Sequence, residues 1–445
     1  MTSISSDIDL AKQRAGQEKK ESPSDQSSLT QPEAPSAPAW GSNDAPDGGL
    51  AAWLVVLGAW CTSFCSFGWI NSIGVFQEFY QSNYLRNYSS GTISWIPSLQ
   101  VFFMFATGPI VGKIYDKSGP RYLILVGSFL HVFGLMMASI ATEYYQILLS
   151  QGVCSAIGVS MIFQPSISVI PGWFNRKRGA AFGILSTGSS IGGVIFPIMV
   201  TRLIDSVGYG WAMRISAFMI LVLLGIANLT IKSRFTPNPQ VVTKAQLAAP
   251  FCEPAFLATM FGLALFTFGQ FVPINYLVVE AMTSGMEDSL AHYLVAILNA
   301  TSLFGRLFTG ILADKVGKYN IFVIAAFATS ATTLALWIPS GNNTDAAHIA
   351  FAALFGFFSG AYVSLIAALV SQISPLKEIG FRTGLIFLSC SIPALTTSPI
   401  AGAILDKENG GWIGVKVFSG VFCIVGTMFV FVARVHKVGW KLVVF

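Results

Sequence analysis

The chain has 445 residues, of which 53% are hydrophobic and only 11% are charged, and its formal net charge is +5. Soluble domains contain roughly 25% charged residues, so this composition excludes an ordinary soluble enzyme. It fits instead a protein built from membrane-spanning helices, each of which needs about 20 apolar residues.

Residues 1–46 are rich in Ser, Pro, Gln, Lys and Glu and contain no apolar run, which predicts a disordered cytoplasmic tail. After this tail, apolar stretches alternate with short polar breaks and predict an all-α polytopic membrane protein with twelve transmembrane helices. The predicted helices cover residues 51–79, 93–114, 121–141, 145–170, 178–202, 211–232, 251–281, 288–313, 319–339, 346–373, 380–405 and 411–435.

The longest interior break, at residues 233–250, divides the predicted helices into two groups of six. We therefore predict an N-terminal six-helix bundle over residues 47–232 and a C-terminal six-helix bundle over residues 251–435. Residues 233–250 are predicted to form a cytoplasmic linker, and residues 436–445 a cytoplasmic C-terminal tail.

Basic residues are concentrated in alternate breaks, for example around Lys117 after the second predicted helix and Arg178 after the fourth. Because cytoplasmic loops of membrane proteins carry the excess of Lys and Arg, both termini are predicted to be cytoplasmic. Of the four N-x-S/T sequons, those at Asn87 and Asn342 then fall on the external side and are predicted glycosylation sites, whereas those at Asn228 and Asn299 lie at or within a span. We expect a multi-pass protein of the plasma membrane.

The pattern G-x-x-x-D-K-x-G occurs twice, each time after the second helix of a six-helix group. It comprises Gly112, Asp116, Lys117 and Gly119 in the first copy, and Gly310, Asp314, Lys315 and Gly317 in the second. The glycines permit tight turns, and each aspartate can either cap a neighbouring helix or pair with a basic residue such as Lys117, Arg121 or Lys315. A second internal similarity relates residues 179–197 to 380–399. Duplicated halves of this kind place a substrate site near the midplane between the repeats.

The repeated loop resembles the loop signature of the major facilitator superfamily, which implies two six-helix halves and alternating access. Two further segments are similar to the signatures of the monocarboxylate porter family, and residues 67–80 are similar to its fungal members. These segments contain Asp47, Gly48, Gly49 and Trp53 at the entry to the first helix, and Trp173, Phe174, Arg178 and Gly183 at the entry to the fifth. The entry departs from the family pattern, because Leu50 replaces the usual Trp and one extra residue precedes Trp53.

Arg306 is the most informative single residue, because it lies in the eighth predicted helix, two turns before Asp314 and about 12 Å from the helix end. A guanidinium at that depth costs at least a few kcal/mol unless it faces water or a partner. The equivalent position in the first half is Gly108, so the arginine belongs to one half only. This asymmetry favours a functional role over the alternative, a structural arginine that binds helix carbonyls.

The resemblance also implies an acid four residues before this arginine and a lysine deep in the first helix. The matching positions here are Ser302 and Asn71, which implies a larger and less charged substrate than lactate and argues against the family's usual proton coupling. Glu280, near the external end of the seventh helix, is a possible counter-ion for Arg306, although a solvated helix end is the favoured interpretation. Further candidates for the substrate cavity, each with interhelical hydrogen bonding as its alternative role, are Gln270, Asn275, Tyr276, Asn299 and Tyr362.

No nucleotide-binding loop, zinc-protease helix, nucleophile elbow or nucleic-acid-binding motif occurs, and the six cysteines lack metal-ligand spacing. We therefore expect no enzymatic activity, cofactor, metal or nucleic-acid partner.

Three functions remain open. The first is a monomeric secondary transporter for a small organic acid or related metabolite, with or without a co-transported proton; fungal resemblance suggests export of a secondary metabolite. The second is a carrier for a neutral or vitamin-like solute, favoured by Asn71 and Ser302, and the third is a transporter-shaped sensor, supported only by the tail.

Overall fold

The computed structural model describes residues 45–235, 244–341, 345–441 and 443–444. Three parts of the prediction therefore lie outside the described residues: the tail up to residue 44, the middle of the linker at 236–243, and the sequon residue Asn342. Within the described residues the regular structure is helical, with no β-strand.

Twelve of the described helices are long and apolar enough to cross a membrane. They cover Leu50–Ser82, Gly91–Ser118, Arg121–Ala138, Tyr144–Trp173, Arg178–Val207, Tyr209–Thr230, Pro254–Thr283, Asp288–Val316, Lys318–Trp337, Asp345–Ile373, Leu376–Lys407 and Ile413–Val438. The predicted number of helices is confirmed, and the predicted ends differ by a few residues. The largest difference is at the fifth helix, which continues past residue 202 to Val207.

Several spans consist of consecutive helical segments. The first span contains α2 (Leu50–Ser63), a π-helical segment η1 (Phe64–Gly68) and α3 (Ile73–Ser82). The second contains α4 (Ser90–Ile93), α5 (Trp95–Ala106) and α6 (Gly108–Ser118), where Pro109 occupies the first turn of α6. A proline is tolerated there because the first turn of a helix needs no intrahelical N–H donor.

The remaining segments follow in chain order. In the N-terminal half, which runs from α2 to α12, they are α7 (Arg121–Ala138), α8 (Tyr144–Ile147), η2 (Leu148–Ser155), α9 (Ala156–Ser168), α10 (Ile170–Trp173), α11 (Arg178–Val207) and α12 (Tyr209–Thr230). After the connecting α13 (Lys244–Cys252), the C-terminal half contains α14 (Pro254–Thr283), α15 (Asp288–Val316), α16 (Lys318–Thr332), η3 (Thr333–Trp337), η4 (Pro339–Gly341), α17 (Asp345–Ile373), η5 (Leu376–Glu378), α18 (Ile379–Lys407) and α19 (Ile413–Val438).

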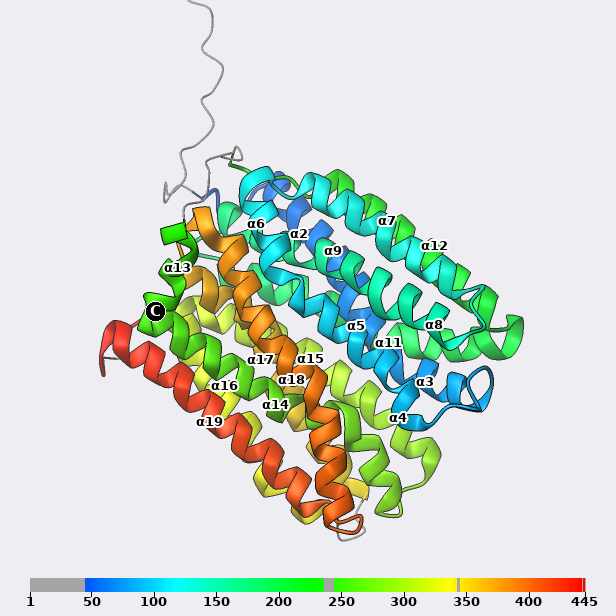
Figure 1. Ribbon diagram of the computed structural model, residues 1–445. Helices are drawn as coiled ribbons and strands as arrows, with labels where there is room; N and C mark the ends of the chain where they lie inside the picture. The colour runs from blue at the N-terminus through cyan, green and yellow to red at the C-terminus, as the bar shows by residue number, and fades with distance from the viewer. Residues whose placement is uncertain (1–44, 236–243, 342–344, 442, 445) are drawn as a thin grey trace, which may run out of the picture. The chain divides into compact units, whose positions relative to one another are not determined.

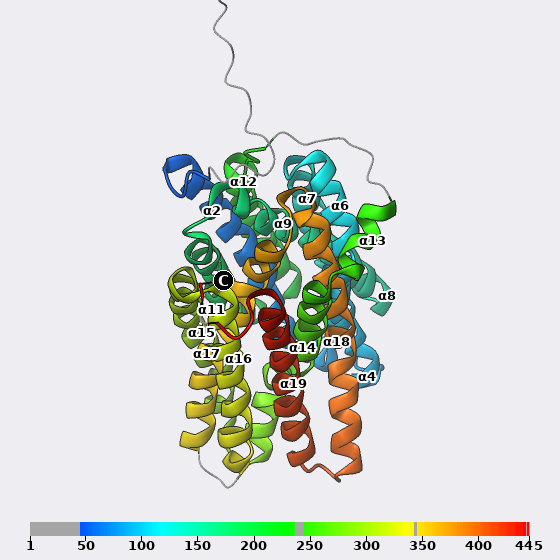
Figure 2. The same cartoon turned by 90° about the vertical axis from the view of Figure 1, so that its left-hand side faces the viewer.

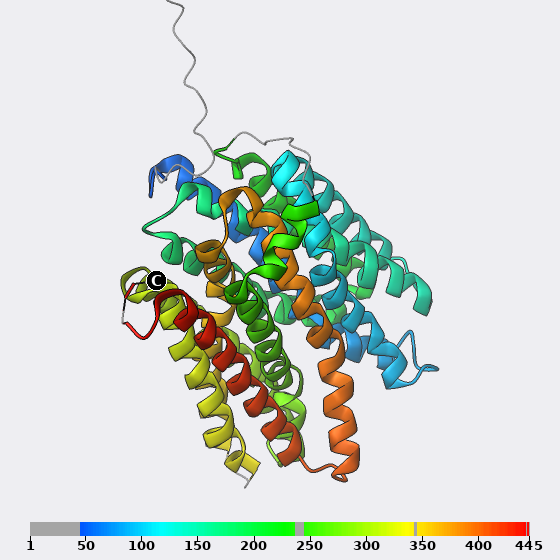
Figure 3. The ribbon, with the colours of Figure 1, turned by 60° about the vertical axis from the view of Figure 1, so that its left-hand side comes forward.

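The helices of each half pack mainly against one another. Figure 1 shows α7, α9 and α12 together in one group, and Figure 2 shows α14, α16, α18 and α19 running side by side in the other. Two helix pairs make the main contacts between the halves: α18 packs against the segments α5 and α6 of one span, and α11 packs against α15. The first of these pairs is visible in Figure 3, where the orange α18 lies alongside the cyan α5 and α6.

Glycines allow both helix pairs to approach closely. A Cβ atom on Gly112 would collide with the backbone of Gly380, and one on Gly179 would lie 2.5 Å from the carbonyl oxygen of Gly310. In a membrane the hydrophobic effect contributes little to helix association, so van der Waals contacts between closely packed backbones contribute much of the stabilising free energy. These glycines therefore hold the two halves together at one end of the helices.

Large apolar side chains are exposed on the outer surface of the helices. Leu229 is 77% exposed, Tyr122 is 69% exposed and Val222 is 66% exposed. Extended apolar surface of this kind is unusual for a soluble monomer and suits contact with lipid chains.

Candidate functional site

The two aspartates of the repeated loop cap helices in the opposite half. Asp116 accepts hydrogen bonds from the backbone N–H groups of Gly380 and Phe381, both at 2.8 Å, at the start of α18. Asp314 accepts hydrogen bonds from Gly179 at 2.7 Å and Ala180 at 2.8 Å, at the start of α11. A carboxylate at a helix start satisfies N–H groups that have no intrahelical partner and faces the positive end of the helix dipole. We call these contacts the aspartate caps, and the end of the helices where they lie the motif end; the opposite end is the far end.

Of the two partners expected for these aspartates, the structure shows the helix start and not the basic residue. Among the described residues, no ion pair joins Asp116 or Asp314 to Lys117, Arg121 or Lys315, and these three side chains are exposed. Instead, each oxygen of both carboxylates accepts a hydrogen bond from a backbone N–H group. The motif glycines Gly119 and Gly317 adopt φ values of 76° and 106°, in the left-handed region that a tight turn after each helix requires.

The two family-like segments form one structural unit at the motif end. The Asp47 carboxylate accepts hydrogen bonds from the N–H groups of Asn175 and Arg176, both at 2.7 Å, in the turn that leads into α11. The rings of Trp53 and Phe174 pack edge to face with centroids 5.1 Å apart. Two segments that are separate in the sequence therefore fix the entries of α2 and α11 relative to one another.

The other residues of these segments support the same entries. Gly48 and Gly49 have φ values of 158° and 86° before α2, and Trp173 donates from its indole nitrogen to the carbonyl oxygen of Lys232 at 2.9 Å. Arg178 is buried and donates to the carbonyl oxygens of Phe174 at 3.0 Å and Ser371 at 3.3 Å, the latter in the C-terminal half. These contacts make the segments part of the scaffold at the motif end.

An ion-pair cluster stabilises the start of the C-terminal half. Arg382 binds both oxygens of Glu253, at 2.6 and 2.8 Å, and donates from Nε to Glu378 at 3.0 Å. The hydrogen bonds from Arg382 lower the pKa of Glu253 below its ordinary value of 4.5. Glu253 precedes α14 and Arg382 lies in α18, so the pair joins two helices of the same half.

Arg306 links the two halves near the middle of α15. Its Nε donates to Ser302 at 3.1 Å, and its Nη1 donates to the carbonyl oxygen of Ser186 at 2.5 Å and to the hydroxyl of Ser189. Ser186 and Ser189 belong to α11 in the N-terminal half. All three acceptors are uncharged, and Nη2 has no hydrogen-bond partner among the described residues. The side chain, which is 7% exposed, is therefore a buried cation without a counter-ion in the described part of the chain.

Two amides extend this arrangement toward the far end. Asn299, Ser302 and Arg306 lie on one face of α15, at spacings of three and four residues. A Cβ atom on Gly193 would lie 2.8 Å from Oδ1 of Asn299 and 3.0 Å from Nδ2 of Asn71. These four side chains therefore gather along α11, and we call Asn71, Asn299, Ser302 and Arg306 the central polar patch.

Within the described residues, no hydrogen bond joins the other predicted cavity residues to this patch. Tyr362 bonds to the hydroxyl of Thr267 at 2.6 Å, inside the C-terminal half. Asn275 and Tyr276 both hold Ser398 of α18, at 3.1 and 2.9 Å. Gln270 is buried, and its side-chain oxygen has no hydrogen-bond partner in the part of the chain that the structure describes.

Four phenylalanine rings meet where the halves face one another. The ring centroids of Phe67 and Phe163 are 4.8 Å apart, those of Phe105 and Phe387 are 5.4 Å apart, and those of Phe163 and Phe387 are 5.9 Å apart. Phe387 belongs to α18, whereas the other three come from the N-terminal half. We call these residues the aromatic layer. Sequence reasoning missed it, because the chain contains 36 phenylalanines and no spacing distinguishes these four.

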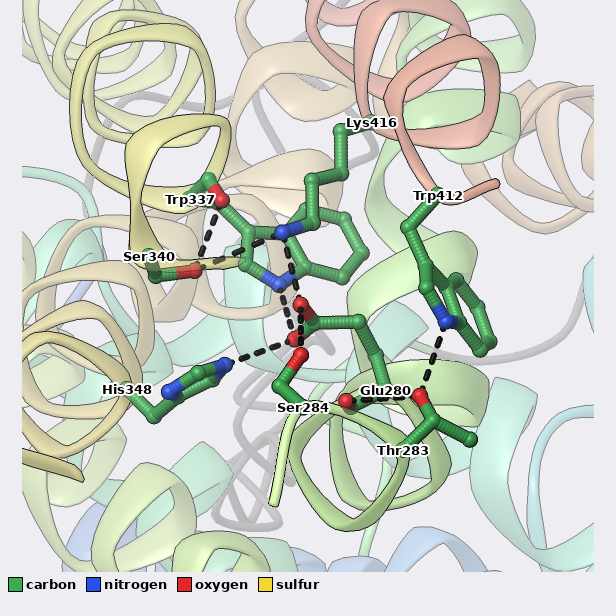
Figure 4. Close-up of polar contacts among 8 residues, drawn as sticks. All are labelled: Glu280, Thr283, Ser284, Trp337, Ser340, His348, Trp412 and Lys416. Atoms are coloured by element: carbon green, nitrogen blue, oxygen red, sulfur yellow. Dashed lines mark hydrogen bonds and ion pairs between the residues drawn. The ribbon is translucent and has the colours of Figure 1, made fainter. Parts of the chain in front are cut away.

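The prediction that Glu280 is a solvated helix end is wrong, and so is its alternative role as a counter-ion for Arg306. Its side chain is completely buried and binds Lys416 at 2.6 Å and His348 at 3.0 Å (Figure 4). The carboxylate lies inside the bundle because two basic side chains from other helices bind it there. Sequence reasoning also missed Lys416, although a lysine inside an apolar run is itself a signal of a buried partner.

Comparison with known proteins identifies the family to which this fold belongs. The family model described as Major Facilitator Superfamily matches residues 55–395 and 255–442. The chain belongs to the Major Facilitator Superfamily. It is therefore a multi-pass membrane transporter and not an enzyme, as the composition predicts.

Several curated relatives in this superfamily come from fungi. The chain is 62% identical to the MFS transporter asaE of Aspergillus flavus over 401 residues, which is 90% of each chain. It is 54% identical to the fujikurins efflux protein of Gibberella fujikuroi, over 87% of this chain and 83% of the relative. It is 37% identical to the aspyridones efflux protein apdF of Emericella nidulans, over 93% of this chain and 83% of the relative.

Solved Major Facilitator Superfamily structures share the fold. FucP in the outward conformation superimposes with a TM-score of 0.68 at 15% identity, over 85% of this chain and 98% of FucP. The proton:xylose symporter XylE superimposes with a TM-score of 0.65 at 14% identity, over 87% of this chain and 96% of XylE. The matched family is the superfamily as a whole, so the narrower similarity to monocarboxylate porters stays a prediction.

Proposed function

We propose that this chain is a secondary active transporter that exports a small organic acid, a fungal secondary metabolite in particular, by alternating access. The observation that carries the proposal is Arg306, a buried guanidinium between the halves whose three hydrogen-bond acceptors are all uncharged. The names of two relatives, the fujikurins and aspyridones efflux proteins, support export as the direction.

An anionic group of the substrate would supply the negative counter-charge that Arg306 does not find among its hydrogen-bond acceptors. Burying an arginine without an acid is costly, and a carboxylate or similar anion at Nη2 would offset that cost. Because the guanidinium is a planar fork of donors, it suits a carboxylate better than a lysine does. Ser302 occupies one side of the guanidinium and leaves its charge intact.

The apolar body of such a substrate would contact the aromatic layer. Phe67 joins the two features, since its ring belongs to the layer and its carbonyl oxygen accepts a hydrogen bond from Asn71 at 2.7 Å. Aromatic rings favour flat apolar groups, and Asn71 adds a neutral amide donor and acceptor. This combination favours a substrate larger and less charged than a short-chain carboxylate.

The aspartate caps supply the gate in this proposal. In the described state they close the motif end, together with the close approach of Gly112 to Gly380 and of Gly179 to Gly310. Breaking both caps would let the halves separate there, and a transporter of this kind then exposes its site to the other side of the membrane.

We further propose that the motif end is cytoplasmic, with both termini on that side, in the plasma membrane. The bundles over residues 47–232 and 251–435 would then be the two moving halves of a monomer, joined by the linker over 233–250. Asn87, which is exposed between α3 and α4, would be an external glycan acceptor.

A carrier for a neutral solute is the second candidate, because Asn71, Asn299 and Ser302 are all uncharged. In that case Arg306 would be a structural tie between α15 and α11. The sensor alternative, in contrast, predicts binding without flux.

Transport by the purified protein in vesicles, with and without a pH gradient, separates these functions. We expect flux of aromatic or apolar organic acids, loss of most flux with Arg306→Lys, and loss of all flux with Arg306→Ala at equal protein abundance. Arg434→Lys is the matched control, since that arginine is also buried but binds Asn320 and the carbonyl oxygen of Gly439, away from the contacts between the halves. Normal flux and unchanged preference for acids in Arg306→Lys would favour the neutral carrier, and binding without flux in the wild type would favour the sensor.

A further inference from the structure

One buried histidine joins two π-helical segments of the N-terminal half. His131 lies in α7 and is completely buried. Its Nε2 lies 3.1 Å from the carbonyl oxygen of Cys65 in η1, and its Nδ1 lies 2.9 Å from the hydroxyl oxygen of Ser155 in η2. Because π-helical segments are rare and occur frequently at functional sites, a side chain that binds two of them is a candidate for a functional role.

The two partners of the ring determine which nitrogen carries the hydrogen. The carbonyl oxygen of Cys65 can only accept, so Nε2 of His131 is the nitrogen that carries a hydrogen and donates it. In the neutral ring, Nδ1 then accepts from the hydroxyl of Ser155. The ring therefore connects the first span to the fourth, and each of its nitrogens has a defined role.

The backbone that carries His131 is held firmly against the fourth span. A Cβ atom on Gly158 would collide with the backbone nitrogen of His131, and one on Gly134 would lie 2.6 Å from the carbonyl oxygen of Ser150. Such close approach leaves no room for α7 to shift relative to η2 and α9. The imidazole is thus a fixed point to which η1 is attached.

The hydrogen bonds of η1 show what this attachment does. In an α-helix the N–H group of Trp69 would donate to the carbonyl oxygen of Cys65, four residues earlier. Here it donates to Ser66 instead, and Cys65 accepts from His131. The histidine therefore binds the carbonyl group that a regular α-helix would use at this place, which stabilises the π-helical form of η1.

The π-helical form sets which residues of the first span face α11. A Cβ atom on Gly68 would lie 2.8 Å from Cα of Gly192, so the aromatic neighbours of Gly68 in the sequence could not take its place. A π-helical turn contains one residue more than an α-helical turn. If η1 relaxed to an α-helix, the residues after it would rotate by about 100°, and Ile70 would move toward the place that Asn71 now occupies.

Two residues of the proposed substrate site depend on this register. Phe67 belongs to η1 and to the aromatic layer. Asn71 follows η1, belongs to the central polar patch and donates to the carbonyl oxygen of Phe67 at 2.7 Å. The register of η1 therefore determines the direction in which both side chains point.

We propose that His131 is a positioning residue: it holds the first span in its π-helical register, and this register places Phe67 and Asn71 for substrate binding. The second half of this statement rests on the proposed transport function, and the first half does not. His131 itself lies outside the substrate site and acts through Cys65.

Cross-linking of the purified full-length protein without substrate tests the first half. A Cβ atom on Gly193 would lie 3.0 Å from Nδ2 of Asn71, which is close enough for cysteines at the two positions to form a disulfide. Gly193→Cys should therefore cross-link with Asn71→Cys and not with Ile70→Cys. All these positions lie in the N-terminal half, so movement of one half relative to the other does not affect the reaction.

The register should shift when the histidine is lost. Adding His131→Leu should slow the cross-link of Asn71→Cys several-fold and allow that of Ile70→Cys. Adding His131→Gln, which keeps an N–H donor for Cys65, should leave both reactions as they are in the parent protein. Unchanged cross-linking of both pairs in His131→Leu would overturn the proposal.

A second variant covers the case in which His131→Leu does not fold. Ser155→Ala removes the hydroxyl that donates to Nδ1, so the hydrogen of the ring is no longer held at Nε2, and the cross-link of Asn71→Cys should slow. Ser150→Ala is the matched control, because Ser150 is also a buried serine of η2 but donates to a carbonyl oxygen of its own span. In that case, equal rates in the two serine variants would overturn the proposal.

Uptake of naphthoate, an aromatic organic acid, by vesicles tests the second half, with protein-free vesicles as the blank. His131→Leu should raise KM several-fold with little change in the maximal rate, and His131→Gln should restore the KM of the wild type. Asn71→Ala should raise KM in the wild type but not further in His131→Leu, because residues that act through one element are not additive. A loss of maximal rate alone, at unchanged KM, would overturn the second half.

The two halves of the proposal can fail separately. Absence of naphthoate flux in the wild type would contradict the proposed function, and the cross-linking rates would still decide whether His131 holds the register of the first span.

Discussion

Asp314 lies 2.7 Å from the backbone nitrogen of Gly179, a residue 135 positions earlier in the chain and in the other half of the molecule. The same relationship joins Asp116 to Gly380 in the opposite direction. Each copy of the repeated loop therefore binds the copy of the second repeat that belongs to the other half. The two internal similarities in the sequence are the two sides of one contact, made twice.

Removal of one aspartate cap should slow transport without unfolding the protein. Asparagine in Asp116→Asn keeps one acceptor oxygen and loses the second, together with the negative charge at the helix start. Loss of a helix cap costs about 0.5–2 kcal/mol, so the balance between the two open states should shift several-fold. Initial flux at equal membrane abundance measures the effect, with Lys117→Gln as the control because that neighbour is exposed. Unchanged flux in Asp116→Asn would show that the cap does not gate transport.

An acid placed beside Arg306 should compete with the substrate. In Ser302→Asp the new carboxylate would pair with Nε of Arg306, which Ser302 now contacts at 3.1 Å. If the substrate is an anion, its KM should rise about tenfold or more. The new carboxylate would compete for the guanidinium, and a loss of about 1.4 kcal/mol of binding free energy weakens binding tenfold. Ser302→Asn is the control of similar size without the charge. Equal KM values for the two variants would mean that the substrate does not bind the guanidinium.

The ion pair at the start of α14 should make the stability of the protein depend on pH at the acid end. Because Arg382 lowers the pKa of Glu253, the pair stabilises the folded state above the ordinary carboxyl pKa and loses this contribution as the pH falls through the folded-state pKa. Glu253→Gln should therefore lower Tm at pH 7 and reduce the decline of Tm below about pH 4.5. Thermal unfolding of the protein in detergent measures this, with Glu78→Gln, at an exposed position, as the control. A Tm decline identical to the wild type would mean that the pair adds no stability.

The orientation can be tested through glycosylation. Asn87 is exposed between α3 and α4, whereas the sequon residue Asn228 lies within α12 and bonds to Ser128 at 3.0 Å. We expect glycosidase treatment to increase the electrophoretic mobility of the wild type, and Asn87→Gln to remove at least part of this change, while Asn228→Gln has no effect. Labelling of the loop at Asn87 from the cytoplasm would reverse the proposed topology.

The sequence predicted the helices and the repeats well, because both depend on local patterns. A membrane span requires a long apolar run whatever its neighbours are, so residues 288–313 identified the eighth span without tertiary information. The two copies of the loop likewise contain glycines at the same positions. Gly119 and Gly317 both adopt a positive φ, as the tight turn after each helix requires.

Side-chain partners could not be predicted in the same way. Lys416 lies in an apolar run whose mean hydropathy stays high despite one charged residue. Nothing in its local sequence identifies Glu280, which is 136 residues earlier, as its partner. Arg306 was singled out correctly as a buried cation, but its acceptors Ser186 and Ser189 are common residues on another helix. Such contacts depend on how the helices pack, which no local pattern encodes.

The starts of the two gate helices differ in a way that bears on the order of opening. The turn before α11 is held by Asp47 from its own half as well as by the nearby Asp314 cap. At the start of α18, Asp116 is the one carboxylate of the described residues that binds the N–H groups, and Glu378 is engaged with Arg382. When the halves part, the start of α11 keeps one compensating anion nearby, whereas α18 exposes bare N–H groups to water. We therefore expect the two contacts between the halves to open in order, with α11 separating from α15 before α6 separates from α18.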